Sequence, residues 1–223
     1  MKISNFHLAI GIPCSFPSVP FDFFRSFTLM EKPSYTLITK TNGPIDTLRN
    51  DIVEKALQEG ATSLLMCDVD QVYDPQTVTK LLAHNLPIVS AKVNRRYPPF
   101  DPIILRLTEE GYKPLGIGDY KPDSLVECDA TGNGCVLYSM DIFRKLPYPW
   151  FEFKKHPDTG MIIGEDVHLC QKLKETGYKI YVDTSIEIGH LTTMIVNDAT
   201  HKLWCAMQIA KEKKAEALGV MEC

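Results

Sequence analysis

This sequence of 223 residues lacks several features that would by themselves indicate a class of protein. It has no internal repeat, no low-complexity tract and no apolar run near the roughly 20 residues that a membrane-spanning helix needs. The apolar stretch at residues 8–14 is interrupted by Gly11 and Pro13 and has no cleavage site after it, so we expect a first strand there and not a signal peptide. With 44% hydrophobic and 23% charged residues, the composition excludes collagen-like and disordered proteins and is typical of a globular fold.

An excess of positive charge is also absent. The chain has 24 Lys and Arg against 28 Asp and Glu, a net charge of −4. A weakly acidic protein has no overall field that attracts a polyanion, so no nucleic-acid partner is expected. The seven cysteines form no C-x-x-C pair and no zinc-type cluster, and most lie in apolar runs, where a free thiol behaves as a small hydrophobic side chain. We therefore expect reduced cysteines and a cytoplasmic location.

Strand patterns and helix patterns alternate over the first half of the chain. Apolar or β-branched runs predict strands at residues 8–12, 35–39, 63–67 and 88–93. Helical spacing predicts one helix over residues 45–57, which ends at Gly60, and a second that begins near Asp74. This alternation predicts an α/β fold with a single doubly wound, mainly parallel, Rossmann-like sheet.

The second half is less regular. Strands are expected at residues 103–107, 135–138 and 179–182, and helices at 141–146, 165–176 and about 197–218. The segments 113–123 and 147–163 are expected to be loops, the second of them a mobile lid that carries Trp150 and Phe151. We expect one domain over residues 1–223.

The most informative motif is Asp68-Val69-Asp70, directly after a predicted buried strand. Side chains at positions i and i+2 of an extended segment point to the same side, so the two carboxylates can converge. Ligands of open α/β sheets bind at the carboxyl ends of the strands. A hard cation such as Mg²⁺ or Mn²⁺, with a bound diphosphate, would relieve the repulsion between the carboxylates. The alternative is a turn whose aspartates cap the helix that begins near Asp74.

Three further motifs each allow a structural and a functional interpretation. Glu165 and Asp166 open a predicted helix, where acidic residues are favoured by the helix dipole, but a carboxylate there could also act as a general base. His190 is either a structural hydrogen-bonding group or a metal ligand, and neutral imidazole suits Mn²⁺ better than Mg²⁺. The turn that contains Gly132 and Gly134 is either a tight connection or a backbone cradle for a ligand.

In this order, the motifs resemble those of the nucleotide-sugar-dependent glycosyltransferases of the GT-A fold, especially small family-2-like enzymes. The resemblance extends from about residue 8 to residue 191 and includes Pro13, Arg49-Asn50, Asp68-Val69-Asp70, Gly132-Asn133-Gly134, Trp150-Phe151, Gly164-Glu165-Asp166 and Gly189-His190. The acidic cluster that usually follows the second strand is replaced by Thr41-Asn42-Gly43, which departs from the family at the contacts to the nucleobase.

The resemblance implies a hexosyltransferase-type enzyme that moves a sugar from a nucleotide-diphosphate sugar to an acceptor hydroxyl, with Mn²⁺ or Mg²⁺ as cofactor. It implies a nucleotide-binding half at about 1–100 and an acceptor-side, catalytic half at about 101–195. The residues that it assigns to the donor are Pro13, Arg49, Asn50, Asp68, Gly132 and Gly134. Those that it assigns to the metal are Asp68, Asp70 and His190. The catalytic residues are Asp166, the candidate base, and Glu165 beside it.

Two other functions remain open from the sequence. Residues 64–72 match the start of a haloacid-dehalogenase-like phosphatase, with Asp119 and Asp123 as its downstream acidic motif, although a complete strand–helix unit precedes the match. A non-catalytic module that binds a nucleotide sugar is the other alternative. Arg95 and Arg96, just past a predicted strand, either add positive charge to a diphosphate site or form a solvated loop.

Overall fold

The computed structural model describes residues 6–116, 118–157 and 159–217, and of residues 211–217 the backbone alone. The chain divides into two compact units, Met1–Leu191 and Thr192–Cys223. The helices of the first unit are α1 Phe21–Leu29, α2 Ile45–Gln58, α3 Thr77–Ala83, α4 Met140–Lys145 and α5 Glu165–Glu175. Its strands are β1 Leu8–Cys14, β2 Tyr35–Thr41, β3 Ser63–Cys67, β4 Gln71–Val72, β5 Ile88–Val93, β6 Ile104–Thr108, β7 Gly111–Pro114, β8 Leu125–Cys128, β9 Ala130–Thr131, β10 Cys135–Ser139, β11 Lys154–Lys155, β12 Ile162–Ile163 and β13 Ile180–His190.

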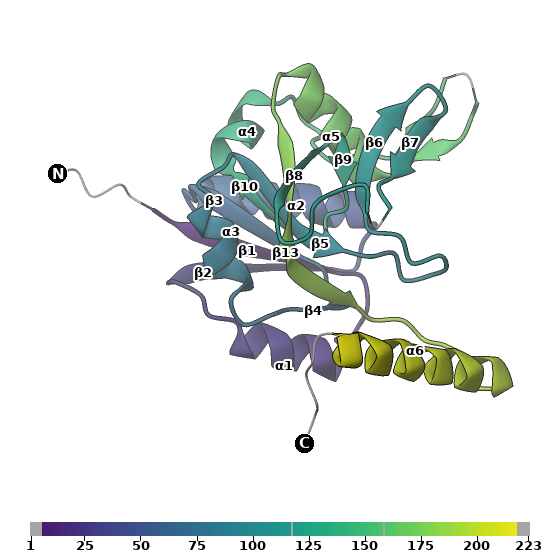
Figure 1. The fold of residues 1–223 in the computed structure, drawn as a ribbon. Helices are drawn as coiled ribbons and strands as arrows, with labels where there is room; N and C mark the ends of the chain where they lie inside the picture. The colour runs from purple at the N-terminus through teal and green to yellow at the C-terminus, as the bar shows by residue number, and fades with distance from the viewer. Residues whose placement is uncertain (1–5, 117, 158, 218–223) are drawn as a thin grey trace. The chain divides into compact units, whose positions relative to one another are not determined.

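An eight-stranded mixed sheet forms the centre of the first unit (Figure 1). The strand order is β2-β1-β3-β10-β5-β13-β4, and β8 pairs with β13. β1 is parallel to β2 and β3, and β5 is parallel to β13. β10 is antiparallel to both β3 and β5, so these two strands also run in the same direction. The predicted α/β fold with a mainly parallel sheet is confirmed.

Helices cover both faces of this sheet, as a doubly wound fold requires (Figure 1). Because side chains alternate along a strand, Leu64 and Met66 of β3 belong to the core under α2, α4 and α5. Leu65 and Cys67 of the same strand belong to the core under α1 and α3. The uninterrupted apolar run of β3 is therefore explained by burial on both faces.

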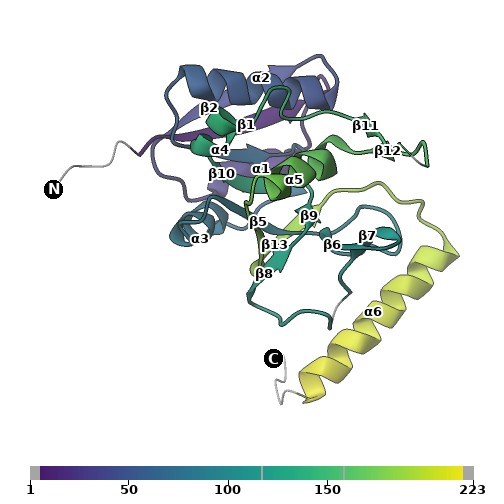
Figure 2. The ribbon, with the colours of Figure 1, turned by 90° about the horizontal axis from the view of Figure 1, so that it is seen from above.

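Two smaller sheets account for the irregular second half. β6, β7 and β9 form a three-stranded sheet, and β7 takes the first two residues of the segment 113–123, which we expected to be a loop. β11 and β12 form a hairpin that extends beyond α5 (Figure 2).

The expectation of a lid over residues 147–163 is wrong for its first part. Trp150 and Phe151 are 7% and 1% exposed and pack against Phe143 of α4. The Trp150 indole donates hydrogen bonds to the carbonyls of Phe143 and Leu146, at 3.0 and 3.2 Å. These aromatic side chains belong to the core because burying them stabilises the fold more than exposing them on a loop.

The helix α1 is an element that the sequence patterns did not predict. It buries Phe23 and Ser26, whereas Phe21 and Phe24 are 73% and 56% exposed.

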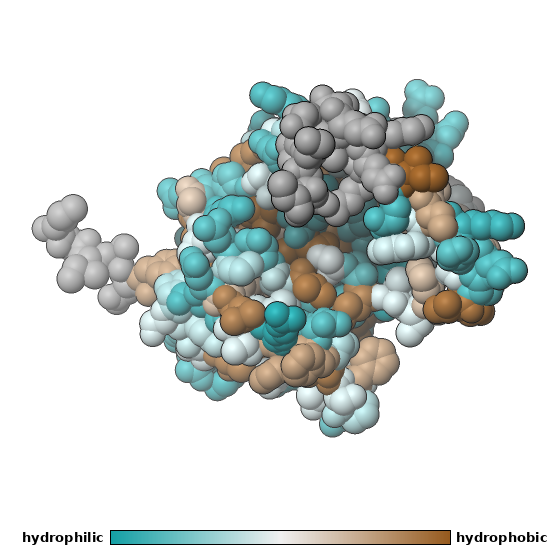
Figure 3. All heavy atoms as spheres, turned by 60° about the horizontal axis from the view of Figure 1, so that its bottom comes forward, coloured by the Kyte–Doolittle hydropathy of each residue, from teal (hydrophilic) through white to brown (hydrophobic). Residues whose placement is uncertain are grey.

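On the side of the molecule seen in Figure 3, hydrophobic residues lie in separate groups between hydrophilic ones.

The second unit contains α6, Asp198–Ala217, where the sequence predicts a helix at about 197–218; residue 218 lies outside the described residues. Within the described ranges, no helix combines the length and the apolar character needed to cross a membrane.

A close contact between β1 and α2 gives a first prediction. A Cβ atom added at Gly11 would overlap the Cγ2 atom of Ile52 and lie 3.2 Å from Cδ1 of Leu64. Gly11→Ala is therefore expected to lower the free energy of unfolding by about 1–3 kcal/mol, because the helix must move away from the sheet. Urea unfolding would measure this change. Ser18→Ala, in an exposed loop, is the control and should leave the free energy of unfolding nearly unchanged. Gly60→Ala would not serve, because Gly60 has a positive φ that alanine adopts only with strain. Equal stability of Gly11→Ala and wild type would contradict the prediction.

Candidate active site

The predicted site residues gather where the parallel strands end. Because β1, β2, β3, β5 and β13 run in the same direction, their carboxyl ends lie at one edge of the sheet (Figure 1). Asp68 follows β3, and His190 ends β13. The chain after β3 continues into β4, whose Gln71 pairs with His190. This crossing brings Asp70 beside His190.

Asp70 lies between two positively polarised side chains. Its Oδ2 atom is 3.2 Å from Nε2 of His190 and 3.0 Å from Nη1 of Arg96. Burial alone would raise the pKa of Asp70, but the hydrogen bond from His190 and the charge of Arg96 lower it below the ordinary value. Burial would lower the pKa of His190, but the bond to Asp70 and the carbonyl of Asn94 raise it.

The imidazole of His190 is held in one orientation. Its Nδ1 atom is 2.8 Å from the backbone carbonyl of Asn94. Since a carbonyl can only accept, Nδ1 carries a hydrogen in this bond and Nε2 faces Asp70. A carbonyl on the far ring nitrogen is a usual arrangement for a histidine that binds a metal through the near one.

Asp68 faces a different cation. Nη2 of Arg49, on α2, lies 2.9 Å from both carboxylate oxygens of Asp68, and Nη1 donates to Glu165 at the start of α5. The Arg49 side chain is 4% exposed. Burial raises the pKa of Asp68 and of Glu165, although the positive charge of Arg49 acts in the opposite direction. Burial would lower the pKa of Arg49, but the neighbouring carboxylates raise it above the ordinary value. Arg49 thus joins β3 to α5 by a buried ion pair.

Asp166 stands beside the glycine turn. Its Oδ1 atom accepts the N–H of Val167 at 2.8 Å, and a Cβ atom at Gly132 would lie 3.6 Å from its Oδ2 atom. The turn itself is tied to Asp68, whose N–H donates to the carbonyl of Gly134 at 3.0 Å. A Cβ atom at Gly134 would lie 2.9 Å from Nε2 of Gln71, so a larger residue there would have to displace the buried Gln71 side chain.

No family model matches the sequence, and no curated protein matches it. Solved structures do match the fold. The crystal structure of A197 from STIV is similar with a TM-score of 0.59 and 18% identity, over 84% of this chain and 87% of that one. The crystal structure of GalNAc-T7 with UDP, GalNAc and Mn²⁺ is similar with a TM-score of 0.55 and 10% identity, over 86% of this chain and 45% of that one.

The fold is GT-A-like. At these identities the likeness concerns the fold alone, and this chain spans less than half of the GalNAc-T7 chain. The resemblance deduced from the motifs is therefore supported at the level of the fold.

A metal would find two protein ligands at this edge. Within the described ranges, no three His, Cys, Asp or Glu side chains converge into a complete metal site. Asp70 and His190 do form a pair of donors, an oxygen and a nitrogen, and both atoms face each other. This donor set fits a cation that takes its remaining ligands from a substrate, and the imidazole favours Mn²⁺ over Mg²⁺.

Two predicted donor-binding residues make contacts within the fold. Pro13 is buried next to the carboxyl end of β1, at the same edge of the sheet, in register with Lys40 of β2. Asn50 faces the segment before α5: its amide donates to the carbonyl of Phe151 at 2.7 Å, and its Oδ1 atom accepts the N–H groups of Trp150 and Phe151, both at 3.0 Å. In this structure Asn50 is a link between α2 and that segment.

Asn50→Ala is expected to lower the free energy of unfolding by about 2–3 kcal/mol, because it leaves buried backbone groups without partners. The melting temperature and urea unfolding would measure the loss. Gln58→Ala, at an exposed position at the end of the same helix, serves as the control. If both variants are equally stable, the hydrogen bonds of Asn50 contribute nothing measurable.

The sequence analysis missed two residues that shape the site. The hydroxyl of Tyr73 donates to the carbonyls of Asp68 and Gly134, at 2.8 and 3.1 Å, and so fixes the turn to the carboxylate segment. Asn94 positions His190 through its backbone carbonyl, for which no sequence signal exists.

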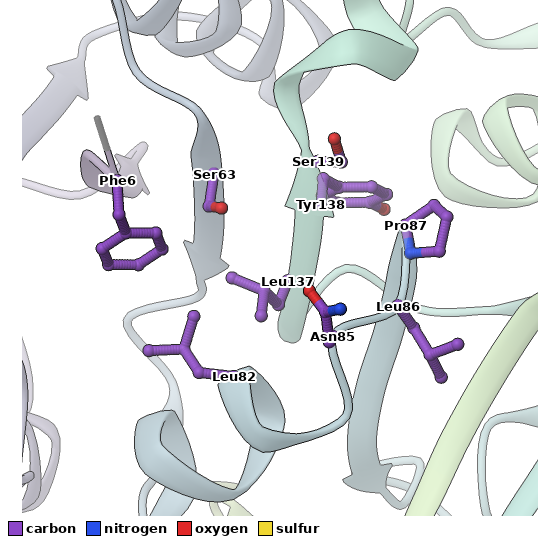
Figure 4. Close-up of a pocket in the computed structure, with 9 residues that line it drawn as sticks. All are labelled: Phe6, Ser63, Leu82, Asn85, Leu86, Pro87, Leu137, Tyr138 and Ser139. Carbon is purple, nitrogen blue, oxygen red and sulfur yellow. The ribbon is translucent and has the colours of Figure 1, made fainter. Parts of the chain in front are cut away.

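A pocket of about 510 Å³ lies at the other end of β3 (Figure 4). It is lined by Phe6, Ser63, Leu82, Asn85, Leu86, Pro87, Leu137, Tyr138 and Ser139. Ser63 is the first residue of β3, whereas Asp68 follows its last residue. We place the candidate site at the carboxyl edge, where the charged side chains converge, and not in this pocket.

Proposed function

We propose that the protein is a metal-dependent glycosyltransferase, which moves a sugar from a nucleotide-diphosphate sugar to an acceptor hydroxyl. The observation that carries this proposal is the meeting of Asp70 and His190 at the carboxyl edge of a GT-A-like sheet. A similar structure contains UDP and Mn²⁺, which supports a nucleotide-sugar donor and a divalent cation. The hexosyl specificity, the cytoplasmic location and the division into halves at about 1–100 and 101–195 remain predictions.

In this proposal Asp70 and His190 hold Mn²⁺, or Mg²⁺, through the two atoms that now face each other. Asp68, which the resemblance also assigns to the metal, is not among the proposed ligands because Arg49 occupies both of its oxygens. The cation would neutralise the negative charge that develops on the departing diphosphate. Asp68 remains on the donor side of the site, where Arg49 holds both of its oxygens. Gly132 and Gly134 let the backbone of their turn approach a ligand closely.

Asp166 is proposed as the base that accepts the proton of the acceptor hydroxyl. A hydroxyl is a weak nucleophile, and a carboxylate within hydrogen-bond reach makes it stronger. Glu165 is bound to Arg49, so its part would be to anchor the start of α5 while Asp166 reaches the substrate.

Asp70→Asn tests the metal site. This change removes the negative charge but keeps the shape, so the Mn²⁺-dependent part of nucleotide-sugar binding is expected to weaken by at least about tenfold. Calorimetric titration with UDP-, GDP- and ADP-sugars, with and without Mn²⁺, would measure it. Asp141→Asn, at an exposed position on α4, is the control. Unchanged Mn²⁺-dependent binding in Asp70→Asn would refute the assignment.

The contacts of Asp119 and Asp123, together with a turnover assay, bear on the two alternatives. A phosphatase of the haloacid-dehalogenase type would use Asp119 or Asp123 beside Asp68. Instead, the carboxylate of Asp119 accepts the N–H of Gly116 at 2.7 Å within its own loop, and Asp123 is exposed. Turnover of a nucleotide sugar with Mn²⁺ would exclude the non-catalytic module.

A further inference from the structure

We propose that Arg96 binds the diphosphate of the donor, and that it rests on Asp70 until a divalent cation takes its place there. This inference rests on the proposed function. It starts from one atom: Oδ2 of Asp70 is 3.0 Å from Nη1 of Arg96 and 3.2 Å from Nε2 of His190. The guanidinium therefore occupies the oxygen that a cation bound between Asp70 and His190 would need.

The guanidinium and the cation exclude each other at this oxygen. A divalent ion lies about 2.1 Å from a carboxylate oxygen, closer than any hydrogen-bond donor. Two positive groups on one oxygen also repel each other strongly in a partly buried site. Arrival of the cation should therefore displace Arg96 and release the Nε2 proton of His190 to water, after which the neutral ring can share the ion with Asp70.

Arg96 can move without any change in its loop. Its side chain is 54% exposed, so it has solvent around it. The loop that carries Arg96 is closed at its base: the backbone N–H of Arg95 donates to the carbonyl of Asp101 at 2.9 Å, and the side-chain amide of Asn94 donates to the carbonyl of Phe100 at 2.7 Å. Displacement is therefore a rotation of one side chain on a fixed loop.

A diphosphate is the partner that the displaced side chain would meet. The diphosphate of the donor would bind the same cation. Its negative charges would then lie within reach of the Arg96 side chain, which the cation has displaced from Asp70. The planar guanidinium presents paired N–H donors that match phosphate oxygens. Arg49 is enclosed by Asp68 and Glu165 and is 4% exposed, so it is less available for this contact than Arg96.

The exchange predicts effects of opposite sign for one substitution. In Arg96→Met, Mn²⁺ alone is expected to bind several-fold more tightly, because a competing cation is gone. With saturating Mn²⁺, the nucleoside diphosphate is expected to bind about tenfold more weakly, because a charged hydrogen bond to phosphate is lost. Both affinities would be measured by calorimetry, first with Mn²⁺ alone and then with UDP, GDP, ADP and CDP.

Arg95→Met is the matched control, since it removes the same charge from the neighbouring residue. It should change either affinity by less than about twofold, because it leaves Asp70 as it is. The proposal is overturned if Arg96→Met fails to tighten Mn²⁺ binding, fails to weaken nucleotide binding, or behaves like Arg95→Met. If wild-type protein with Mn²⁺ binds none of the four nucleotides, the proposed function itself fails, and the exchange fails with it.

Discussion

Replacing Arg49 with methionine is expected to lower the free energy of unfolding by about 3–5 kcal/mol, because it removes one partner of a buried ion pair. Methionine is close in length but carries no charge, so the buried Glu165 and the half-buried Asp68 would be left without their cation. Urea unfolding, followed by circular dichroism, would measure the loss. The site should lose its shape as well, since Arg49 joins the end of β3 to the start of α5.

Lys55→Met on the same helix is the control. Lys55 forms an exposed ion pair with Glu59, and such pairs contribute at most about 1 kcal/mol. The pKa of Glu165, already raised by burial, should rise further without Arg49. A carboxyl whose pKa is higher in the folded state than in the unfolded state binds protons on folding, so the deficit of Arg49→Met should shrink as pH falls below neutrality. Equal losses in both variants would contradict the buried pairing.

Asp166→Asn is expected to lower turnover by on the order of 100-fold or more, while donor affinity stays within a few-fold. Asparagine can still accept the N–H of Val167 through its carbonyl oxygen, so the start of α5 should keep its shape. What it loses is the ability to take a proton from the acceptor. Transfer rates at saturating donor, beside calorimetric donor binding, separate these two effects.

The exposed Glu175, at the other end of α5, provides the control as Glu175→Gln. It should leave turnover unchanged. If Asp166→Asn turns over like wild type, Glu165 and Asp166 are acidic residues at a helix start, favoured by the helix dipole, and the base lies elsewhere.

The elements that the sequence predicted best are those whose own residues decide their conformation. β3 and β5 coincide with the predicted strands because both are rich in apolar side chains that are buried on both faces of the sheet. α2 extends one residue beyond the predicted helix, and the positive φ of Gly60 lies close behind its end. The convergence of Asp70 with His190 also followed from strand direction, since parallel strands end at the same edge.

The remaining features depend on partners that are distant in the sequence. Arg49 and Glu165 are separated by 116 residues, and no spacing rule connects them. The sequence around Trp150 and Phe151 predicted an exposed loop. Both side chains are instead buried, because they pack against Phe143 and their backbone N–H groups are bound by Asn50 of α2. β10 has the apolar pattern of a parallel strand, and its antiparallel direction follows from the path of the chain around it.

The neighbouring positions of Arg49 and Asn50 on α2 have a consequence for the order in which the protein folds. Glu165, the second partner of Arg49, and Trp150, a partner of Asn50, lie 116 and 100 residues later in the chain, so closing these contacts costs the entropy of a long loop. A growing chain can form α2 and β3 early, but Arg49 meets Glu165 only after α5 has been synthesised and docked. The ion pairs at the carboxyl edge should therefore be the last to form. In a chain that ends before residue 165, the Arg49 guanidinium could pair with Asp68 but not with Glu165.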